Sequence, residues 1–120
     1  DIVEHRRIAQ IHDRYREKFA RRILDEVEMQ EYLQAPSKEK LLAKRFAAKE
    51  AASKALGTGF SGGISLHMIA IRHDEHGKPL LALRDKAAAC ADNLGVVNQL
   101  LSISDEQNYA IAMVVLETAD

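Results

Sequence analysis

Residues 38–59, KEKLLAKRFAAKEAASKALGTG, decide the fold of this 120-residue chain. Alanines recur in it at every fourth position, the spacing of one face of an α-helix: Ala43, Ala47, Ala51 and Ala55. We predict a helix from about Lys38 to Leu56, with Ser37 at its start and Gly57 as its stop. A stripe of small side chains lets another backbone approach closely, so we expect this helix to be central.

The segments on either side of this helix predict an α+β fold in a single small domain. Helical spacing comes first along the chain, whereas after the Gly-rich loop at 57–63 the apolar period changes to two. The nearly continuous apolar run at 109–117 predicts a strand buried on both faces. The other expected elements are helices at 4–12, within 17–34 and at 86–94, and antiparallel strands at 66–73, 79–83 and 98–104.

Composition narrows the class of protein. The formal net charge is −1, which disfavours nucleic acid as the partner, and no apolar run approaches the length of a membrane span. Cys90 is the single cysteine, so we expect a cytoplasmic protein without a disulfide. Positive charge gathers within residues 5–22, which indicates a local anionic partner.

Glu50 and Lys54 are the first candidates for chemistry, because a spacing of four places them on one helix face. A solvated ion pair is the simpler interpretation of such a pair. The neighbouring Gly-rich loop could bring backbone amides to an anion, and Asp1 could join Glu50 around Mg²⁺, which prefers oxygen ligands. Asp1 could equally be a helix cap or a frayed end. The five histidines show no metal-ligand spacing.

Taken together, several segments resemble the holo-acyl-carrier-protein synthase family of 4′-phosphopantetheinyl transferases. The resemblance covers nearly the whole chain and implies one phosphopantetheinyl transferase domain over 1–120, with the initiator Met and the family's first strand missing ahead of Asp1. The resemblance rests on the order and spacing of the segments more than on any single segment. The segments are DIVE at 1–4, FARRIL at 19–24, KRFAAKEAASKALGTG at 44–59, GKP at 77–79 and LSISDE at 101–106, followed by Tyr109-Ala110.

The resemblance also implies roles for individual residues. Asp1 and Glu50 match the two carboxylates that bind Mg²⁺, and Glu50 and Lys54 are the expected catalytic pair, with Lys54 near the diphosphate of coenzyme A. The expected contacts to coenzyme A are Arg45, Lys49, Lys54, Gly57, Thr58, Gly59 and Pro79. Many relatives carry a histidine where this chain has Asp105, so the phosphate contact of that histidine is not carried over.

The implied partners are coenzyme A and acyl carrier protein, in fatty acid and lipid biosynthesis. Acyl carrier protein is acidic, and the basic first helices resemble the surface that docks it. We name as the docking surface Arg7, Arg14, Lys18, Arg21 and Arg22. Family members are usually homotrimers with active sites between subunits, so we expect the same assembly here.

The implied reaction moves 4′-phosphopantetheine from coenzyme A to a serine of apo acyl carrier protein. The serine hydroxyl attacks the β-phosphate, and adenosine 3′,5′-bisphosphate leaves. Two candidates remain for the base that takes the serine proton, Glu50 and a water on the metal. The alternative functions are a non-catalytic module that binds coenzyme A or acyl carrier protein and, with less support, a nucleic-acid-binding domain that uses residues 5–22.

Overall fold

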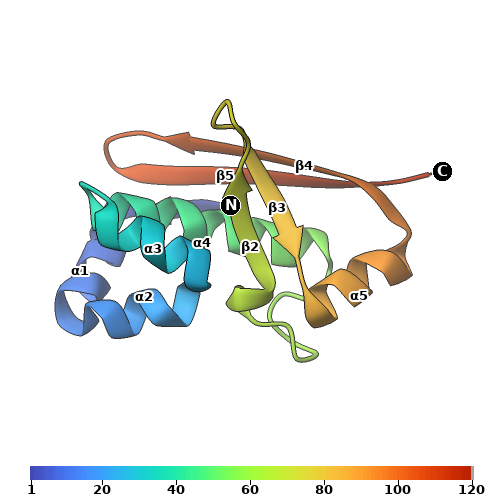
Figure 1. Cartoon of the computed structure of the whole chain (residues 1–120), viewed down its shortest axis with the longest axis horizontal. Coiled ribbons are helices and arrows are strands. Elements are labelled where there is room, and N and C mark those ends of the chain that lie inside the picture. The colour runs from blue at the N-terminus through green and yellow to red at the C-terminus, as the bar shows by residue number, and fades with distance from the viewer. Residues whose placement is uncertain (120) are drawn as a thin grey trace.

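The structure is a computed structural model and describes residues 1–119. It confirms the α+β class and the central place of the long helix (Figure 1). The helices are α1 (His5–Tyr15), α2 (Glu17–Ile23), α3 (Glu26–Gln34), α4 (Lys38–Ala55) and α5 (Asp85–Leu94), with a 3₁₀ turn η1 (Leu66–Met68). The strands are β1 (Ile2–Glu4), β2 (Ile69–His73), β3 (Pro79–Leu83), β4 (Val96–Asp105) and β5 (Tyr109–Thr118).

Local sequence explains where several elements differ from expectation. The segment 17–34 forms two helices, because Asp25 starts α3 with a capping box in which it and Glu28 bond each other's backbone N–H. The strand expected at 66–73 opens instead with η1 and becomes extended only at Ile69. Residues 2–4, for which the sequence predicted no strand, pair with β5.

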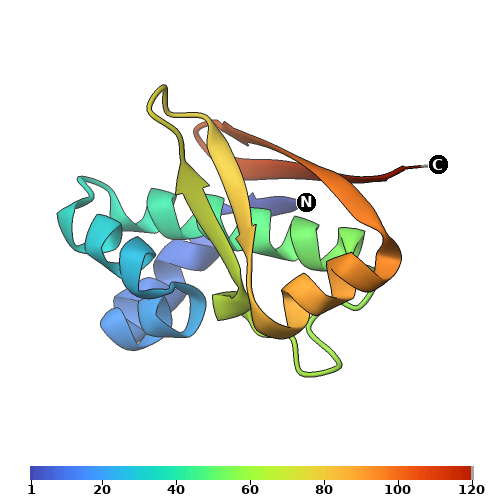
Figure 2. The same ribbon diagram turned by 45° about the vertical axis from the view of Figure 1, so that its right-hand side comes forward.

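Two antiparallel sheets enclose α4. One has the strand order β1-β5-β4, and the other is the β2–β3 hairpin. The long β4–β5 hairpin runs along α4, and the β2–β3 hairpin crosses the same helix on another side (Figures 1 and 2). Ala110 and Ala112 of β5 share one buried cluster with Ala43, Ala47 and Ala51 of α4, so small side chains face each other where helix and strand meet. Within residues 1–119 no helix is long and apolar enough to cross a membrane.

The prediction that β5 is buried on both faces is wrong for the single chain. Its inward side chains are buried, but its outward ones are exposed, and Met113 is 65% accessible. The register places exposed apolar neighbours beside them, since Ile2 of β1 pairs with Ile111 and Leu100 of β4 pairs with Val115. We name as the outer sheet face Ile2, Leu100, Ile111, Met113 and Val115.

A buried ion pair joins α4 to its surroundings. Lys49 and Glu28 both have fully buried side chains, and Lys49 Nζ donates to Glu28 Oε1 at 2.7 Å. The same ammonium donates to the backbone oxygens of Ile23 at 2.8 Å and Leu66 at 3.1 Å, so three acceptors match its three protons. Burial lowers the pKa of Lys49, while the Glu28 carboxylate opposes that shift.

The network extends from Glu28 to the β2–β3 hairpin. Glu28 Oε2 accepts from the backbone N–H of Ile71 at 3.2 Å, and the neighbouring Asp25 carboxylate accepts from Arg72. Burial acts to raise the pKa of Asp25, but hydrogen bonds from Arg72 and from the Glu28 backbone outweigh it and lower that pKa to about 2. Consequently α3, α4, η1 and β2 are connected by one set of buried polar contacts.

We predict that Lys49→Met lowers the free energy of unfolding by about 3–5 kcal/mol, because it leaves the Glu28 carboxylate buried without its cation. The control is Arg21→Met, which breaks an exposed pair with Glu17 and should cost no more than about 1 kcal/mol. Urea denaturation of both variants measures the difference. A Lys49→Met loss no larger than the control's would contradict the role of this pair.

Candidate functional site

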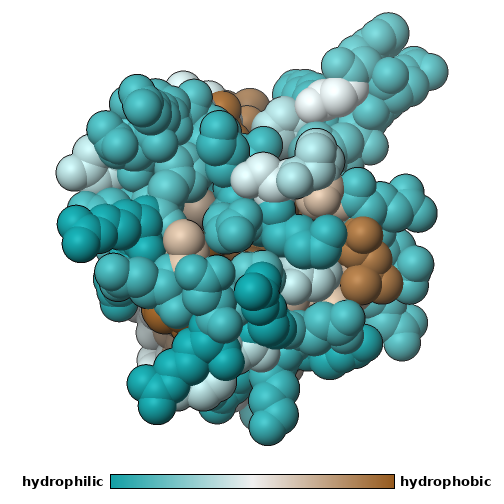
Figure 3. All heavy atoms as spheres, turned by 90° about the vertical axis from the view of Figure 1, so that its left-hand side faces the viewer, coloured by the Kyte–Doolittle hydropathy of each residue, from teal (hydrophilic) through white to brown (hydrophobic). Residues whose placement is uncertain are grey.

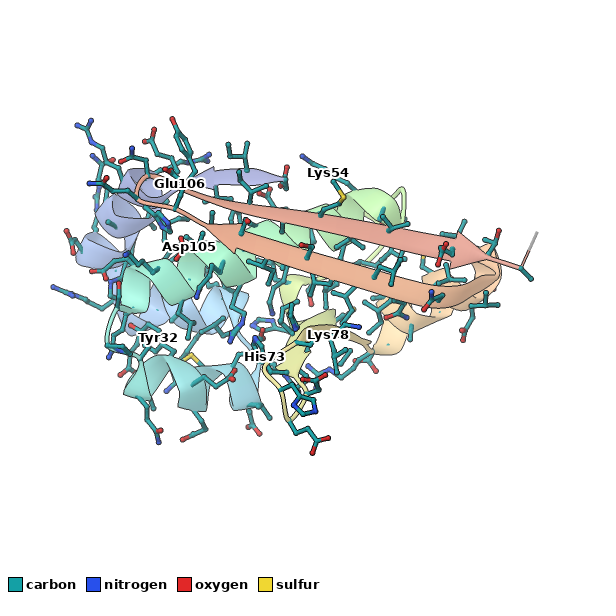
Figure 4. All side chains as sticks on the ribbon, turned by 90° about the horizontal axis from the view of Figure 1, so that it is seen from above. Tyr32, Lys54, His73, Lys78, Asp105 and Glu106 are labelled. Carbon is teal, nitrogen blue, oxygen red and sulfur yellow. The ribbon has the colours of Figure 1, made fainter. Side chains whose placement is uncertain are left out.

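Asp1 and Lys54 meet although 53 positions separate them in the sequence. Asp1 lies at the start of β1, where its carbonyl accepts from the Ala112 N–H of β5 at 2.8 Å. Its side chain is only 14% exposed, and its Oδ1 accepts from Lys54 Nζ at 2.7 Å. Lys54 itself is 67% exposed near the end of α4 (Figure 4). The pair therefore presents a cation at the surface beside a partly buried carboxylate.

Glu50 lies one turn before Lys54 on the same face of α4 and is half-buried. In the described part of the chain its carboxylate takes part in no hydrogen bond or ion pair, whereas its backbone oxygen accepts from Ser53 Oγ at 2.8 Å. Since Lys54 reaches Asp1, the fold brings Asp1 to the helix face that carries Glu50. Two carboxylates with free oxygens are the donor set that a hard cation such as Mg²⁺ prefers.

The predicted Gly-rich loop continues from the end of α4. Gly57 and Gly59 have φ angles of 85° and 55°, a left-handed conformation that favours glycine. A Cβ at either position would meet no atom within 4 Å among the described residues, so backbone conformation rather than crowding requires glycine here. Thr58 Oγ1 donates to the Gly59 carbonyl at 2.9 Å. The space beside the two glycines, just past the end of α4, is therefore open.

A separate pocket of about 240 Å³ lies beside the first half of α4, and both Arg45 and Pro79 line it. Arg45 is only 7% exposed, and its Nη2 lies 3.4 Å from a Glu31 carboxylate oxygen. Its Nη1 has no hydrogen-bond partner within residues 1–119. Burial, followed by the charge of Arg45, lowers the pKa of His73 in the same pocket. A buried guanidinium with an unused donor is suited to an anion.

Asp105 lies in this pocket as well, at the hairpin end of β4 (Figure 4). Its Oδ1 lies 2.6 Å from Nε2 of His5, a buried side chain at the start of α1. His5 was not among the residues predicted from sequence, because 100 positions separate it from Asp105 and nothing in its neighbourhood suggests a site. The fold thus places the His5 imidazole in contact with Asp105, the position for which the family resemblance implies a histidine.

The structure does not support the expected contact between Lys49 and coenzyme A. Lys49 shares the signature segment with Glu50, but its side chain is fully buried and its three protons are taken by protein acceptors. One helical step of about 100° separates the two side chains. Lys49 therefore faces the core, whereas Glu50 faces the surface.

The two groups of candidate residues lie apart on α4. Arg45 and Lys54 are nine residues apart, which corresponds to about 13 Å along the helix and about 180° around it. Lys54 and Glu50 belong to one face, whereas Arg45 and its pocket belong to the opposite one. We name these the carboxylate half-site (Asp1, Glu50 and Lys54) and the arginine half-site (Arg45, His73, Pro79 and Asp105).

All five residues of the docking surface are exposed, at the end of the molecule formed by α1 and α2. That end is largely hydrophilic (Figure 3). Among residues 1–119 only Arg21 of this set forms an ion pair, with Glu17 at 3.4 Å. A pocket of about 680 Å³ is lined by apolar Phe19 and Phe46 together with Lys18 and Arg22. Positive charge therefore borders an apolar groove.

Comparison with known proteins relates this geometry to a family. The profile of the 4′-phosphopantetheinyl transferase superfamily matches residues 1–114. The holo-[acyl-carrier-protein] synthase of Vibrio cholerae is 51% identical over 117 residues, which are 98% of this chain and 93% of that protein. Among solved structures, the holo-[acyl-carrier-protein] synthase of Neisseria meningitidis is 41% identical with a TM-score of 0.91, covering 98% of this chain and 94% of that one. The Helicobacter pylori enzyme in complex with coenzyme A is 32% identical with a TM-score of 0.84, covering 98% and 96%.

Proposed function

The chain belongs to the 4′-phosphopantetheinyl transferase superfamily, and we propose that it carries out its transfer with Asp1, Glu50 and Lys54 around the diphosphate of coenzyme A. It is a holo-[acyl-carrier-protein] synthase, which moves 4′-phosphopantetheine from coenzyme A to a serine of acyl carrier protein. The observation that carries the site assignment is the contact between Lys54 and Asp1, one turn from Glu50. This assignment favours an enzyme over a non-catalytic binding module.

Asp1 and Glu50 would hold Mg²⁺, because they offer carboxylate oxygens and Asp1 already attracts a cation, the Lys54 ammonium. When bound, Mg²⁺ would offset negative charge on the diphosphate oxygens. The protein's own task is to position groups, since phosphoryl transfer depends on alignment and on neutralising charge more than on covalent help.

Lys54 is placed to neutralise or protonate the oxygen of the leaving adenosine 3′,5′-bisphosphate. Its ammonium is exposed and held by a single carboxylate, so it can turn from Asp1 to a phosphate without losing a buried contact. We assign Gly57, Thr58 and Gly59 to contacts with coenzyme A, because this loop follows the turn of α4 that carries Lys54 and the space beside its two glycines is open. Glu50 is our candidate for the base that takes the serine proton, since of the two carboxylates in this half-site it is the one without a protein partner in the described chain.

We predict that Glu50→Gln abolishes transfer at every Mg²⁺ concentration while the fold remains intact, because an amide keeps the shape but removes a charge. Mass spectrometry of apo acyl carrier protein incubated with coenzyme A, Mg²⁺ and each variant measures the product. Glu17→Gln, an exposed carboxylate on α2, is the matched control and should stay active. Undiminished turnover of Glu50→Gln at limiting Mg²⁺ would refute the assignment.

For the arginine half-site we propose the nucleotide end of coenzyme A, with Arg45 at a phosphate and Pro79 beside the base. The unused Nη1 of Arg45 supports this proposal, because a buried cation gains most from an anionic partner. Within one chain, however, α4 itself separates the two half-sites. We therefore propose a homotrimer in which the carboxylate half-site of one subunit faces the arginine half-site of its neighbour.

The outer sheet face is our candidate for the subunit interface. Its five apolar side chains form one surface across three paired strands, and exposed apolar patches of this kind mark places where another protein binds. The strands themselves are fixed by α4, so the face is already formed before any subunit arrives.

We predict that Met113→Glu dissociates the homotrimer and reduces transfer by at least an order of magnitude, because it puts a charge at the centre of the outer sheet face. Leu94→Glu, at an exposed apolar position on α5 outside the outer sheet face, should leave assembly unchanged. Light scattering after gel filtration measures the mass.

Mixing two inactive variants gives the sharper check of the shared site. Chains with Glu50→Gln and chains with Arg45→Gln should regain part of the activity when they are unfolded and refolded together, because one interface then has both intact half-sites. If the mixture stays inactive, or if a monomer is fully active, the shared site is refuted.

Acyl carrier protein is the partner that we propose for the docking surface. Its acidic surface would meet five exposed cations, of which only Arg21 forms an ion pair within residues 1–119. Charges at the rim of an interface act mainly on the association rate and its salt dependence. Since Cys90 is unpaired, we place this encounter in the reducing cytoplasm.

We predict that Arg14→Glu with Arg21→Glu raises the KM for acyl carrier protein severalfold and leaves the KM for coenzyme A nearly unchanged. Added salt should reduce the difference in this KM between the variant and the wild type, because charges are screened over about 8 Å at physiological ionic strength. Steady-state kinetics at two salt concentrations measure this. The control is Lys86→Glu, an exposed cation on α5. Equal effects on both KM values, or no effect on either, would refute the docking assignment and show that this surface is an ordinary solvated face.

A further inference from the structure

Three side chains that the transferase chemistry does not use come together where α1 meets the start of α4. His12 and Asp13 are consecutive on α1, and Glu39 lies in the first turn of α4. One ligand atom from each lies within 4.8 Å of the other two. His12 is buried, Glu39 is half-buried and Asp13 is exposed, so the cluster opens to solvent on one side only.

His12 points an unused nitrogen at this cluster. Its side chain is 2% exposed, and its Nδ1 has no hydrogen-bond partner within the part of the chain that the structure describes. Glu39 Oε1 lies 3.9 Å away from it, which is too long for a hydrogen bond. A buried polar atom without a partner is costly, and native structures usually satisfy it with water or an ion.

Tyr32 fixes the other side of the imidazole. Its hydroxyl lies 2.7 Å from His12 Nε2, and its ring meets the imidazole edge-on with centroids 5.7 Å apart. The phenol oxygen of Tyr32 can accept a hydrogen bond from Nε2. If Nε2 carries the proton, Nδ1 presents a lone pair to two carboxylates. Histidines that bind metals typically hold their second nitrogen in such a hydrogen bond.

The charge of the cluster also calls for a cation. Two carboxylates gather beside the imidazole, and Lys38 donates to the backbone oxygens of Leu33 and Ala35 and not to them. Arg16 is the other cation whose charge acts here, on Tyr32, and it forms no ion pair within residues 1–119. A nitrogen ligand favours a borderline transition metal over Mg²⁺, which prefers oxygen alone. Around tetrahedral Zn²⁺ two ligand atoms lie about 3.3 Å apart, so the His12–Glu39 pair at 3.9 Å and the pairs with Asp13, all within 4.8 Å, would close around the ion, and a water would be its fourth ligand.

We propose that His12, Asp13 and Glu39 form a site for a divalent transition metal of the Zn²⁺ class, which clips α1 to the first turn of α4. The site is distinct from the carboxylate half-site, which contains only oxygen and ammonium groups. The sequence concealed it, because 27 positions separate His12 from Glu39 and no short spacing joins them.

Competition between Zn²⁺ and a chromophoric chelator, with the full chain in saturating Mg²⁺, tests the proposal. Mg²⁺ blocks the carboxylate half-site, so the remaining Zn²⁺ site should bind one ion per chain. We expect Glu39→Gln and Asp13→Asn each to weaken Zn²⁺ at least about tenfold, and Tyr32→Phe, which removes the support of Nε2, about tenfold. Glu50→Gln should leave this affinity unchanged.

Thermal unfolding provides a second measurement, because a metal that binds only the folded chain raises its melting temperature. Zn²⁺ should raise it in the wild type and not in Glu39→Gln, a partly exposed position whose amide fits the same space. His76→Gln, which alters an exposed His76–Glu75 pair, is the control for non-specific Zn²⁺ binding by a surface histidine. The proposal is overturned if the wild type binds no Zn²⁺, if Glu39→Gln binds it as tightly, or if only His76→Gln weakens it.

Discussion

The buried contact between Lys49 and Glu28 is the constraint on which the rest of the structure depends. An ammonium without exposure to water needs all three protons accepted, and the acceptors come from α2, α3 and the residue that opens η1. This requirement fixes the rotation of α4 about its own axis. Because Glu28 also accepts from the β2 backbone, the same contact holds the β2–β3 hairpin against the helices.

Once the rotation of α4 is fixed, every other side chain on it has an assigned direction. Lys49 faces the core, Ala43, Ala47 and Ala51 face β5, and Glu50 and Lys54 face the start of β1. Arg45 then faces the opposite side, next to the β2–β3 hairpin that carries His73 and Pro79. The buried pair thus positions both half-sites without touching either of them.

Sequence alone predicted the elements whose signals are local. The alanine spacing predicted α4 to within one residue, and the resemblance to the transferase family grouped Asp1, Glu50 and Lys54, of which the structure brings Asp1 and Lys54 into contact one turn from Glu50. The resemblance could not assign the role of Lys49, because sequence alone does not distinguish a lysine that binds a phosphate from one that is buried in the core. Pairs such as His5–Asp105 and His12–Glu39 depend on long-range contacts that leave no periodic trace.

The error in β5 has a physical meaning. Its apolar run predicted burial on both faces, but α4 covers the inner face and nothing within residues 1–119 covers the outer one. An apolar run of this kind is what a strand buried in an assembly would need, whereas the single chain shows only its own contacts. In the proposed homotrimer the same association that covers Ile111, Met113 and Val115 would bring the two half-sites together. Assembly and catalysis would then be linked, since the free energy gained by burying the outer sheet face would also hold coenzyme A between two subunits.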